Sequence, residues 1–242
     1  MEESWGPDSL WALARDAIFP PAAFDAGPIQ VDAILALSGA TKPLDVLDLP
    51  CGPGRHALPL AERGHRVVAV DRTPSYLAEL RSAAGELPIE VVQADMRDFA
   101  RDDAFDLALN LYHSFGYFPD RADDARVLAN LRRSLRDGGA LVMDLHSWEL
   151  MGRGFEPVRE RALPDGSVVR EEASIDGDWM TSTWTLTRDG EAHARDMSLR
   201  LYSAETLRAA LNEAGFPYVT VFGGFDLRPW DDEAVRLVVL AR

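Results

Sequence analysis

Lysine, cysteine and basic charge are all scarce in this sequence of 242 residues. Lys42 is the only lysine, and it lies beside Pro43 with no GxxxxGK pattern around it, which excludes a pyridoxal phosphate site and a phosphate-loop lysine. Cys51 is the only cysteine, which excludes an internal disulfide and a CxxC zinc site and fits a reducing compartment. The net charge is −15, so the chain is expected to repel nucleic acid and anionic membranes.

Long apolar runs are absent as well. No run approaches the roughly 20 residues that span a bilayer. The first residues are acidic and lack the positive start and unbroken apolar stretch of a secretory signal. The chain length and the 47% hydrophobic content fit one large domain with a single core. We therefore expect a cytoplasmic protein whose partner is a small molecule, with no nucleic acid and no membrane.

Residues 44–146 alternate between short apolar segments and amphipathic ones. This alternation predicts a doubly wound, mostly parallel α/β sheet of Rossmann-like type with helices on both faces. Helices over 9–19 and 28–38 precede it, and its last helix is predicted over 123–139. The predicted strands, seven in total, cover 45–49, 66–71, 89–95, 105–112, 140–146, 218–223 and 234–242.

Residues 156–202 have the alternating pattern of long antiparallel strands. Asp176-Gly177 and Asp189-Gly190 stand where tight hairpin turns are expected, so a small inserted antiparallel sheet is predicted. Ser203 and Gly215 are the expected caps of a following helix. The expected division is a helical cap at 1–40, a core at 41–150, an inserted sheet at 151–202 and a segment completing the core at 203–242.

The turn after the first strand contains the glycines of a ligand-binding loop. Gly52 and Gly54 let the backbone turn sharply, so that a ligand can lie against the start of the next helix. Asp71 ends the second strand 17 residues after Gly54, where an acidic side chain can reach ribose hydroxyls. The full GxGxxG pattern is absent, so an adenosine ligand without phosphates is favoured over a dinucleotide.

The third strand ends in a second carboxylate. Asp95 lies where it can accept a hydrogen bond from the adenine amino group, and Met96 can cover the ring. Together with Asp71 and the glycine turn, these residues outline a complete adenosine site.

Five stretches carry a resemblance to a known family: VLDLPCGPGRH, VVAVD, QADMRDF, FDLALNLYHSFGYF and LRDGGALVMDLH. In their order and spacing the chain resembles class I S-adenosylmethionine-dependent methyltransferases, and LYSAETLRAALNEAGF with two final strands resembles the family's ending. The resemblance implies S-adenosyl-L-methionine as cofactor and S-adenosyl-L-homocysteine as product. Pro50 replaces the usual family Gly and stiffens the turn. The implied cofactor-binding residues are Asp48, Gly52, Gly54, Arg55, Asp71, Arg72, Asp95, Met96 and Asn110.

The end of the fourth strand, residues 110–118, is expected to face the transferred methyl group. His113 and His146 follow neighbouring strand ends, and either is a candidate general base near pH 7. No metal site is expected, because His113, Asp144 and His146 match no recognised ligand spacing. Trp5 and Trp11 are expected to close over the cofactor. The candidate substrate-binding residues are Tyr112, His113, Tyr117, Trp148, Tyr202 and Trp230.

The resemblance implies methyl transfer to an N or O atom of a small molecule, such as a natural product, an amino sugar or an amino-acid-like metabolite. Three alternatives stay open: a different reaction with the same cofactor, an NAD(P)-dependent oxidoreductase, and a noncatalytic partner subunit. The broken GxGxxG disfavours the second alternative, and the intact glycines and carboxylates disfavour the third. The inserted sheet is expected to be a substrate lid or a dimer face, which leaves a homodimer open.

Overall fold

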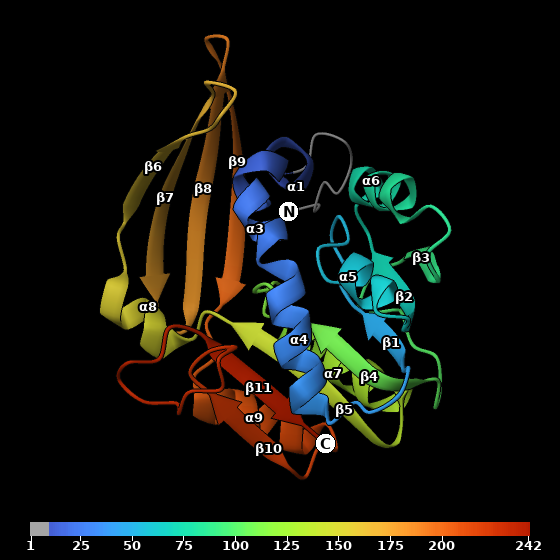
Figure 1. Cartoon of the computed structure of the whole chain (residues 1–242). Coiled ribbons are helices and arrows are strands. Elements are labelled where there is room, and N and C mark those ends of the chain that lie inside the picture. The colour runs from blue at the N-terminus through green and yellow to red at the C-terminus, as the bar shows by residue number, and fades with distance from the viewer. Residues whose placement is uncertain (1–9) are drawn as a thin grey trace.

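The computed structural model describes residues 10–242, and its core is a seven-stranded sheet in the order β10-β11-β5-β4-β1-β2-β3 (Figure 1). Strand β11 is antiparallel to both of its neighbours, and the other pairs of the core are parallel. The predicted doubly wound, mostly parallel α/β sheet is therefore confirmed. The strands are β1 (Asp45–Asp48), β2 (Arg66–Asp71), β3 (Ile89–Gln93), β4 (Phe105–Asn110), β5 (Leu135–Leu145), β10 (Val219–Phe222) and β11 (Leu237–Ala241).

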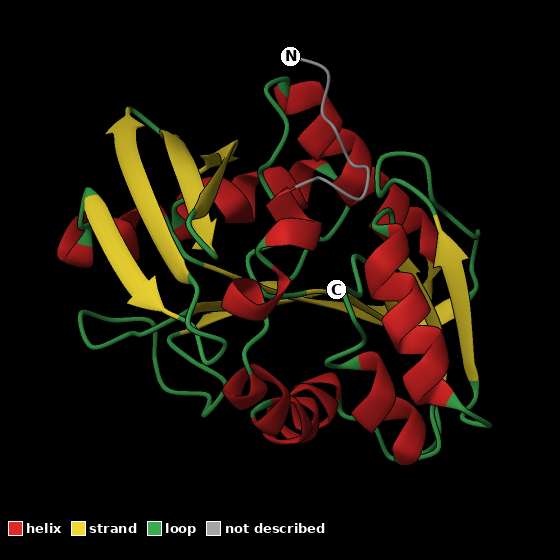
Figure 2. Ribbon diagram, turned by 90° about the horizontal axis from the view of Figure 1, so that it is seen from above, coloured by secondary structure: helices red, strands yellow, loops and turns green. Residues whose placement is uncertain are grey.

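Helices cover both faces of this sheet, which Figure 2 shows nearly edge-on. One face packs against α4 (Gly27–Ser38), α5 (Ala57–Glu62) and α6 (Pro74–Ala84), through buried residues such as Ile34, Leu60 and Leu77. The other face packs against α7 (Arg121–Ser134) and α9 (Ala204–Glu213). Within residues 10–242, no helix is both long and apolar enough to cross a membrane.

Helix α7 ends at Ser134, so the predicted helix over 123–139 is too long. Leu135 is already extended and pairs with Phe105 at the start of β5, and both side chains are buried. Gly138 then adopts a φ of +78°, which is incompatible with a continuing helix. Burial of Leu135 in the core thus favours a strand over one more helical turn.

The amino-terminal segment is more broken than its helical spacing predicts. It forms α1 (Leu10–Leu13) and α2 (Arg15–Ile18) in place of one helix over 9–19, and α3 (Pro21–Asp25) follows them. Proline at the first position of α3 suits a helix start, because its missing N–H has no partner there in any case. These short helices lie beside the inserted sheet and above the strand ends of the core (Figure 1).

The insertion forms a separate antiparallel sheet in the order β6-β7-β8-β9, as predicted. Asp189 and Gly190 both have positive φ and form the expected two-residue turn. In the preceding hairpin Asp176 pairs with Trp179, so the turn residues are Gly177 and Asp178, one position later than expected. The strands are β6 (Val158–Ala162), β7 (Val168–Asp176), β8 (Trp179–Arg188) and β9 (Glu191–Arg200), and α8 (Trp148–Gly154) leads into them.

Helix α9 begins as predicted. The Ser203 side chain accepts a hydrogen bond from the Thr206 backbone N–H, and the Thr206 side chain accepts one from the Ser203 N–H. Gly215 follows the C-cap Ala214 with a φ of +95° and lets the chain turn back toward the sheet.

Candidate functional site

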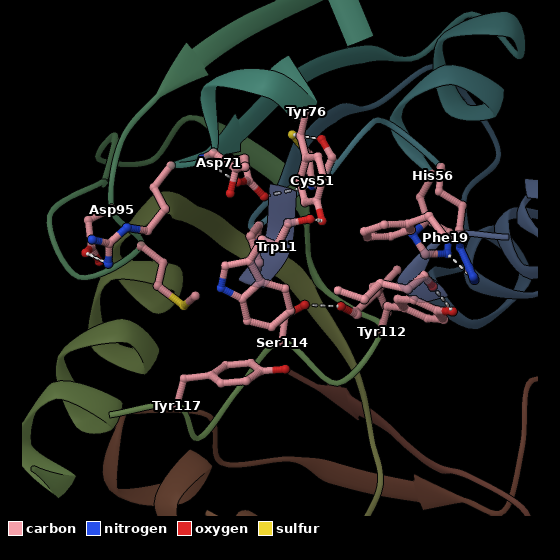
Figure 3. A pocket seen from close by; sticks show the side chains of 18 of the residues that line it. Trp11, Phe19, Cys51, His56, Asp71, Tyr76, Asp95, Tyr112, Ser114 and Tyr117 are labelled. Carbon is pink, nitrogen blue, oxygen red and sulfur yellow. Dashed lines mark hydrogen bonds and ion pairs between the residues drawn. The ribbon is translucent and has the colours of Figure 1, made fainter. Parts of the chain in front are cut away.

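A first cavity lies over the carboxyl ends of β1, β2 and β4, beneath the amino-terminal helices. Trp11 lies between Asp71 on one side and Tyr112 and Tyr117 on the other (Figure 3). Of the predicted cofactor-binding residues, the structure brings six to the wall of this cavity: Gly52, Arg55, Asp71, Arg72, Asp95 and Met96.

The Asp71 carboxylate connects two segments of the cavity wall. Its carboxylate accepts hydrogen bonds from the backbone N–H of Gly52 at 2.9 Å and of Thr73 at 2.8 Å. The carboxylate thereby joins the glycine turn after β1 to the start of α6. Burial raises the pKa of Asp71 above its ordinary value, against the lowering effect of these hydrogen bonds.

Gly52 and Gly54 are each required in the turn for a different structural reason. Gly52 has a φ of +54°, and a Cβ there would lie 3.0 Å from the Phe19 ring in the cavity wall. Gly54 has a φ of +93°, and a Cβ there would lie 2.3 Å from Cδ1 of Leu80 in α6. Gly54 therefore permits close packing of the turn on α6, and it does not line the cavity.

Asp48 and Asn110 also lie below the cavity. The Asn110 side chain donates to the Leu49 carbonyl at 2.9 Å and so ties the end of β4 to the turn. Asp48 is 1% exposed, and its carboxylate makes no hydrogen bond of ordinary geometry with the described residues. Burial, and then the nearby Asp71, raise the pKa of Asp48 to about 8. An orphaned, buried carboxyl beside the cavity fits a cofactor whose amino group is positively charged.

Replacing Asp48 with asparagine is expected to stabilise the protein at high pH. The folded-state pKa of about 8 lies above the unfolded value of about 3.9, so stability present at low pH is lost as the pH rises through 8. Asparagine does not titrate. The difference in unfolding free energy between the variant and the unsubstituted protein is therefore expected to favour the variant by about 2–5 kcal/mol more at pH 9 than at pH 4. Urea unfolding at both pH values measures this change, with the exposed Asp98→Asn as control. An equal difference at both pH values would contradict a buried, protonated Asp48.

Asp95 lies in the cavity as predicted, but two arginines already engage it. Its carboxylate accepts hydrogen bonds from Arg72 Nη1 at 2.8 Å, Arg97 Nη2 at 2.9 Å and the Arg97 backbone N–H at 2.9 Å. Burial acts to raise the pKa of Asp95, and these partners nevertheless hold it below its ordinary value. The carboxylate is therefore ionised and fixed in place, with Met96 beside it in the cavity wall.

Arg55 points inward, with only 4% of its surface exposed. Its guanidinium stacks 4.4 Å from the centre of the Tyr112 ring and donates to the Gln30 side chain of α4. Its Nε atom has no hydrogen-bond partner among the described residues. A guanidinium pairs well with a carboxylate, so this cation fits the carboxylate end of the cofactor.

A second cavity of about 600 Å³ adjoins the first one. It lies between the ends of β4 and β5 and the inner face of the inserted sheet. Trp11, Ile18, Tyr112 and Tyr117 line both cavities, so the two cavities share a wall. Much of its wall is apolar and comes from α8 and the inserted sheet: Met151, Phe155, Val169, Met180, Met197, Leu199 and Leu201.

His113 and His146 lie together in the wall of the second cavity, with ring centres 3.6 Å apart. Burial lowers the pKa of both imidazoles, and the Arg236 cation lowers it further. Both imidazoles are therefore weaker bases than the sequence alone predicts, because the sequence reveals neither their surroundings in the fold nor the Arg236 cation beside them.

Three predicted substrate-binding aromatics lie outside both cavities. Trp148 is 50% exposed, and its indole donates to the Gly177 carbonyl. Tyr202 is buried in the core, and its hydroxyl donates to Asp124 at 2.9 Å. Trp230 packs against the same core cluster. Local aromatic content does not distinguish such packing residues from ligand contacts. Trp5 lies outside the described residues.

Sequence reasoning missed several residues of the two cavities. Phe19, Thr73 and Tyr76 line the first cavity, and Glu171 lines the second. The aromatic amino-terminal segment was the one available signal for Phe19. In residues 10–242, no group of three or more His, Cys, Asp or Glu side chains is arranged to hold a metal ion.

Comparison with known proteins identifies the domain around the first cavity. Residues 46–139 match the family model of the methyltransferase domain. The chain is 34% identical over 114 residues to the cypemycin N-terminal methyltransferase of a Streptomyces species, which covers 46% of each chain. It is 27% identical over 194 residues to the glycine/sarcosine/dimethylglycine N-methyltransferase of Actinopolyspora halophila, covering 78% of this chain and 34% of that protein. The chain thus spans less than half the length of these two relatives.

Solved structures extend the likeness to nearly the whole chain. An S-adenosylmethionine-dependent methyltransferase from Clostridium acetobutylicum has a TM-score of 0.79 at 17% identity, covering 95% of both chains. The sugar N-methyltransferase KedS8 from Streptoalloteichus has a TM-score of 0.70 at 23% identity, covering 90% of this chain and 87% of that one. At such identities the likeness establishes the fold. Residues 46–139 thus match a methyltransferase domain, and the chain has the class I fold of the S-adenosylmethionine-dependent methyltransferases it resembles.

Proposed function

We propose that the protein transfers a methyl group from S-adenosylmethionine to an amine nitrogen of a small molecule. The observation that carries this proposal is the second cavity, which adjoins the cofactor cavity and is covered by the inserted sheet. A substrate bound there reaches the cofactor cavity between Tyr112 and Tyr117. The inserted sheet and the amino-terminal helices then act as a lid that selects the substrate by shape.

The chemistry needs alignment and exclusion of water more than it needs a strong base. The cofactor supplies an electron-poor methyl carbon, which a nucleophile attacks in line. A neutral amine has a free lone pair and loses its extra proton easily after transfer, whereas a hydroxyl needs a base during transfer. The lowered pKa values of His113 and His146 therefore favour an amine.

The side chains of the first cavity fit a cofactor-binding role in which each part of the ligand has a partner. Asp71 is suited to the ribose, Asp95 with Met96 to the adenine, and Arg55 to the terminal carboxylate. The net charge of −15 argues for a small substrate over a nucleic acid. The named relatives are methyltransferases of a peptide amino terminus, of glycine derivatives and of a sugar nitrogen, which agrees with an amine.

Calorimetric titration of the purified protein with S-adenosylmethionine, S-adenosylhomocysteine and NADH tests the cofactor assignment. Micromolar binding of the two sulfur ligands without binding of NADH is expected. Incubation with a methyl-labelled cofactor and matched pairs of amines and alcohols then tests the acceptor atom, with label expected in the amines only. Transfer to alcohols alone would contradict the nitrogen assignment, and binding of NADH alone would contradict the function as a whole.

A further inference from the structure

The loop after β4 has an unusual backbone that a neighbouring strand holds in place. Tyr112 and His113 have φ values of +62° and +59°, the left-handed region that non-glycine residues seldom adopt. Asp144, near the end of β5, accepts a hydrogen bond from the Tyr112 N–H through its carboxylate at 2.7 Å. Its backbone carbonyl accepts one from the His113 N–H at 3.1 Å. Strained backbone of this kind persists only where its surroundings impose it, and here it lies between the two cavities.

Arg236 completes this arrangement from a third segment of the chain. It directly precedes β11, which pairs with β5 so that Val238 lies opposite Asp144. Its Nη1 atom donates to the Asp144 carboxylate and lies 3.3 Å from Nε2 of His113. Asp144 is 1% exposed, so this ion pair is largely shielded from solvent. One guanidinium nitrogen thus contacts both the residue that holds the loop and the imidazole of His113.

The chemistry of arginine decides the protonation of this imidazole. A guanidinium has only donors, so its contact with Nε2 is a hydrogen bond only if Nε2 is unprotonated and accepts. A neutral imidazole with a free Nε2 carries its proton on Nδ1. We propose that Arg236, held by Asp144, is a positioning residue that keeps His113 neutral with its proton on Nδ1, so that neither ring nitrogen of His113 is free to take a proton from the substrate.

The other end of the imidazole agrees with this role. Nδ1 of His113 is buried and has no hydrogen-bond partner among the described residues. A proton enclosed there does not exchange directly with a substrate, and Nε2 already accepts from Arg236. This inference rests on the proposed function and deepens it: His113 does not act as the base, so the acceptor is an amine that needs no base during transfer.

The charges around His113 also favour its neutral form. Arg236, Arg55 and the stacked His146 all oppose a positive charge on His113. Asp144 is the nearby anion, and its carboxylate is already engaged by Arg236 and the Tyr112 N–H. The imidazole is therefore expected to stay neutral throughout the neutral pH range.

Nitrogen NMR of the whole protein labelled in its histidines tests the proposal without any turnover. The His113→Asn variant assigns the His113 signals. In the unsubstituted protein at pH 7 we expect a protonated δ nitrogen and an unprotonated ε nitrogen. A proton on the ε nitrogen, or on both, would overturn the proposal. This result is independent of cofactor binding and methyl transfer, so the proposed function can fail separately.

Variants of Arg236 test its positioning role. In Arg236→Met, the His113 signals are expected to shift toward other protonation states, and a new inflection is expected in the pH profile of turnover. With an amine substrate at pH 7, KM, kcat and cofactor affinity are expected to change little, because no base is required during transfer. Arg236→Lys keeps a cationic donor and should restore both readouts in part. The exposed Arg228→Met, in the same connection, is the control. Unchanged His113 signals in a folded Arg236→Met protein would overturn the proposal.

Discussion

Asp71→Ala is expected to weaken the binding of S-adenosylmethionine by about 5- to 150-fold, or about 1–3 kcal/mol. The Asp71 carboxylate holds the glycine turn to the start of α6 through the Gly52 and Thr73 N–H groups. Alanine leaves both donors without their partner and removes the acceptor proposed for the ribose. Calorimetry with S-adenosylmethionine measures the change in affinity.

Two control variants separate these contributions. Asp98→Ala removes an exposed carboxylate whose partner is Arg126 at the surface, and its effect on affinity is expected to be negligible. Asp71→Asn keeps the shape of the side chain and one acceptor oxygen, so an intermediate loss is expected. Unchanged affinity in Asp71→Ala would remove this residue from the cofactor site.

Gly116→Ala is expected to destabilise the fold by about 2–5 kcal/mol. Gly116 has a φ of +98°, and a Cβ there would lie 2.6 Å from the backbone oxygen of Arg200. Its own carbonyl accepts a hydrogen bond from the Arg200 N–H at 2.7 Å, which joins the loop after β4 to the end of β9. Because a backbone atom cannot move aside as a side chain can, the inserted sheet must shift. Thermal and urea unfolding measure the loss.

Gly138→Ala is the matched control for this variant. Gly138 also has a positive φ, of +78°, but a Cβ there would have no atom within 4 Å. Only the conformational cost of about 1–2 kcal/mol is expected. Equal destabilisation by the two substitutions would contradict the role of the close contact between Gly116 and Arg200.

Much of the fold follows from local patterns in the chain. The central residues VVAV of β2 are all apolar, because both faces of a parallel sheet are covered. The turn Asp189-Gly190 and the N-cap Ser203 are encoded within a few residues and were correctly predicted. The predicted end of α7 was wrong, because the true end depends on the pairing of Leu135 with Phe105, which is 30 positions away in the sequence.

The residues of the candidate site were likewise predictable where they depend on local patterns, and not where they depend on packing. The glycine turn, Asp71 and Asp95 follow strand ends, and the carboxyl ends of parallel strands meet at one edge of the sheet. Six of the nine predicted cofactor residues consequently line one cavity. Gly54 differs because the need for glycine there comes from Leu80, a neighbour that only packing of α6 brings close.

The sequence by itself determined the α/β sheet, the inserted antiparallel sheet and the strand-end residues of the cofactor cavity, because periodicity and turn residues act over short distances along the chain. Only the tertiary structure decided which aromatics reach a cavity, and it placed Tyr112 and Tyr117 there but not Trp148, Tyr202 and Trp230. It also decided which charged group lies beside His113, since Arg236 is 123 positions away and approaches only when β11 pairs with β5. Burial and charge contacts depend on which segments meet in space, and no local pattern carries that information.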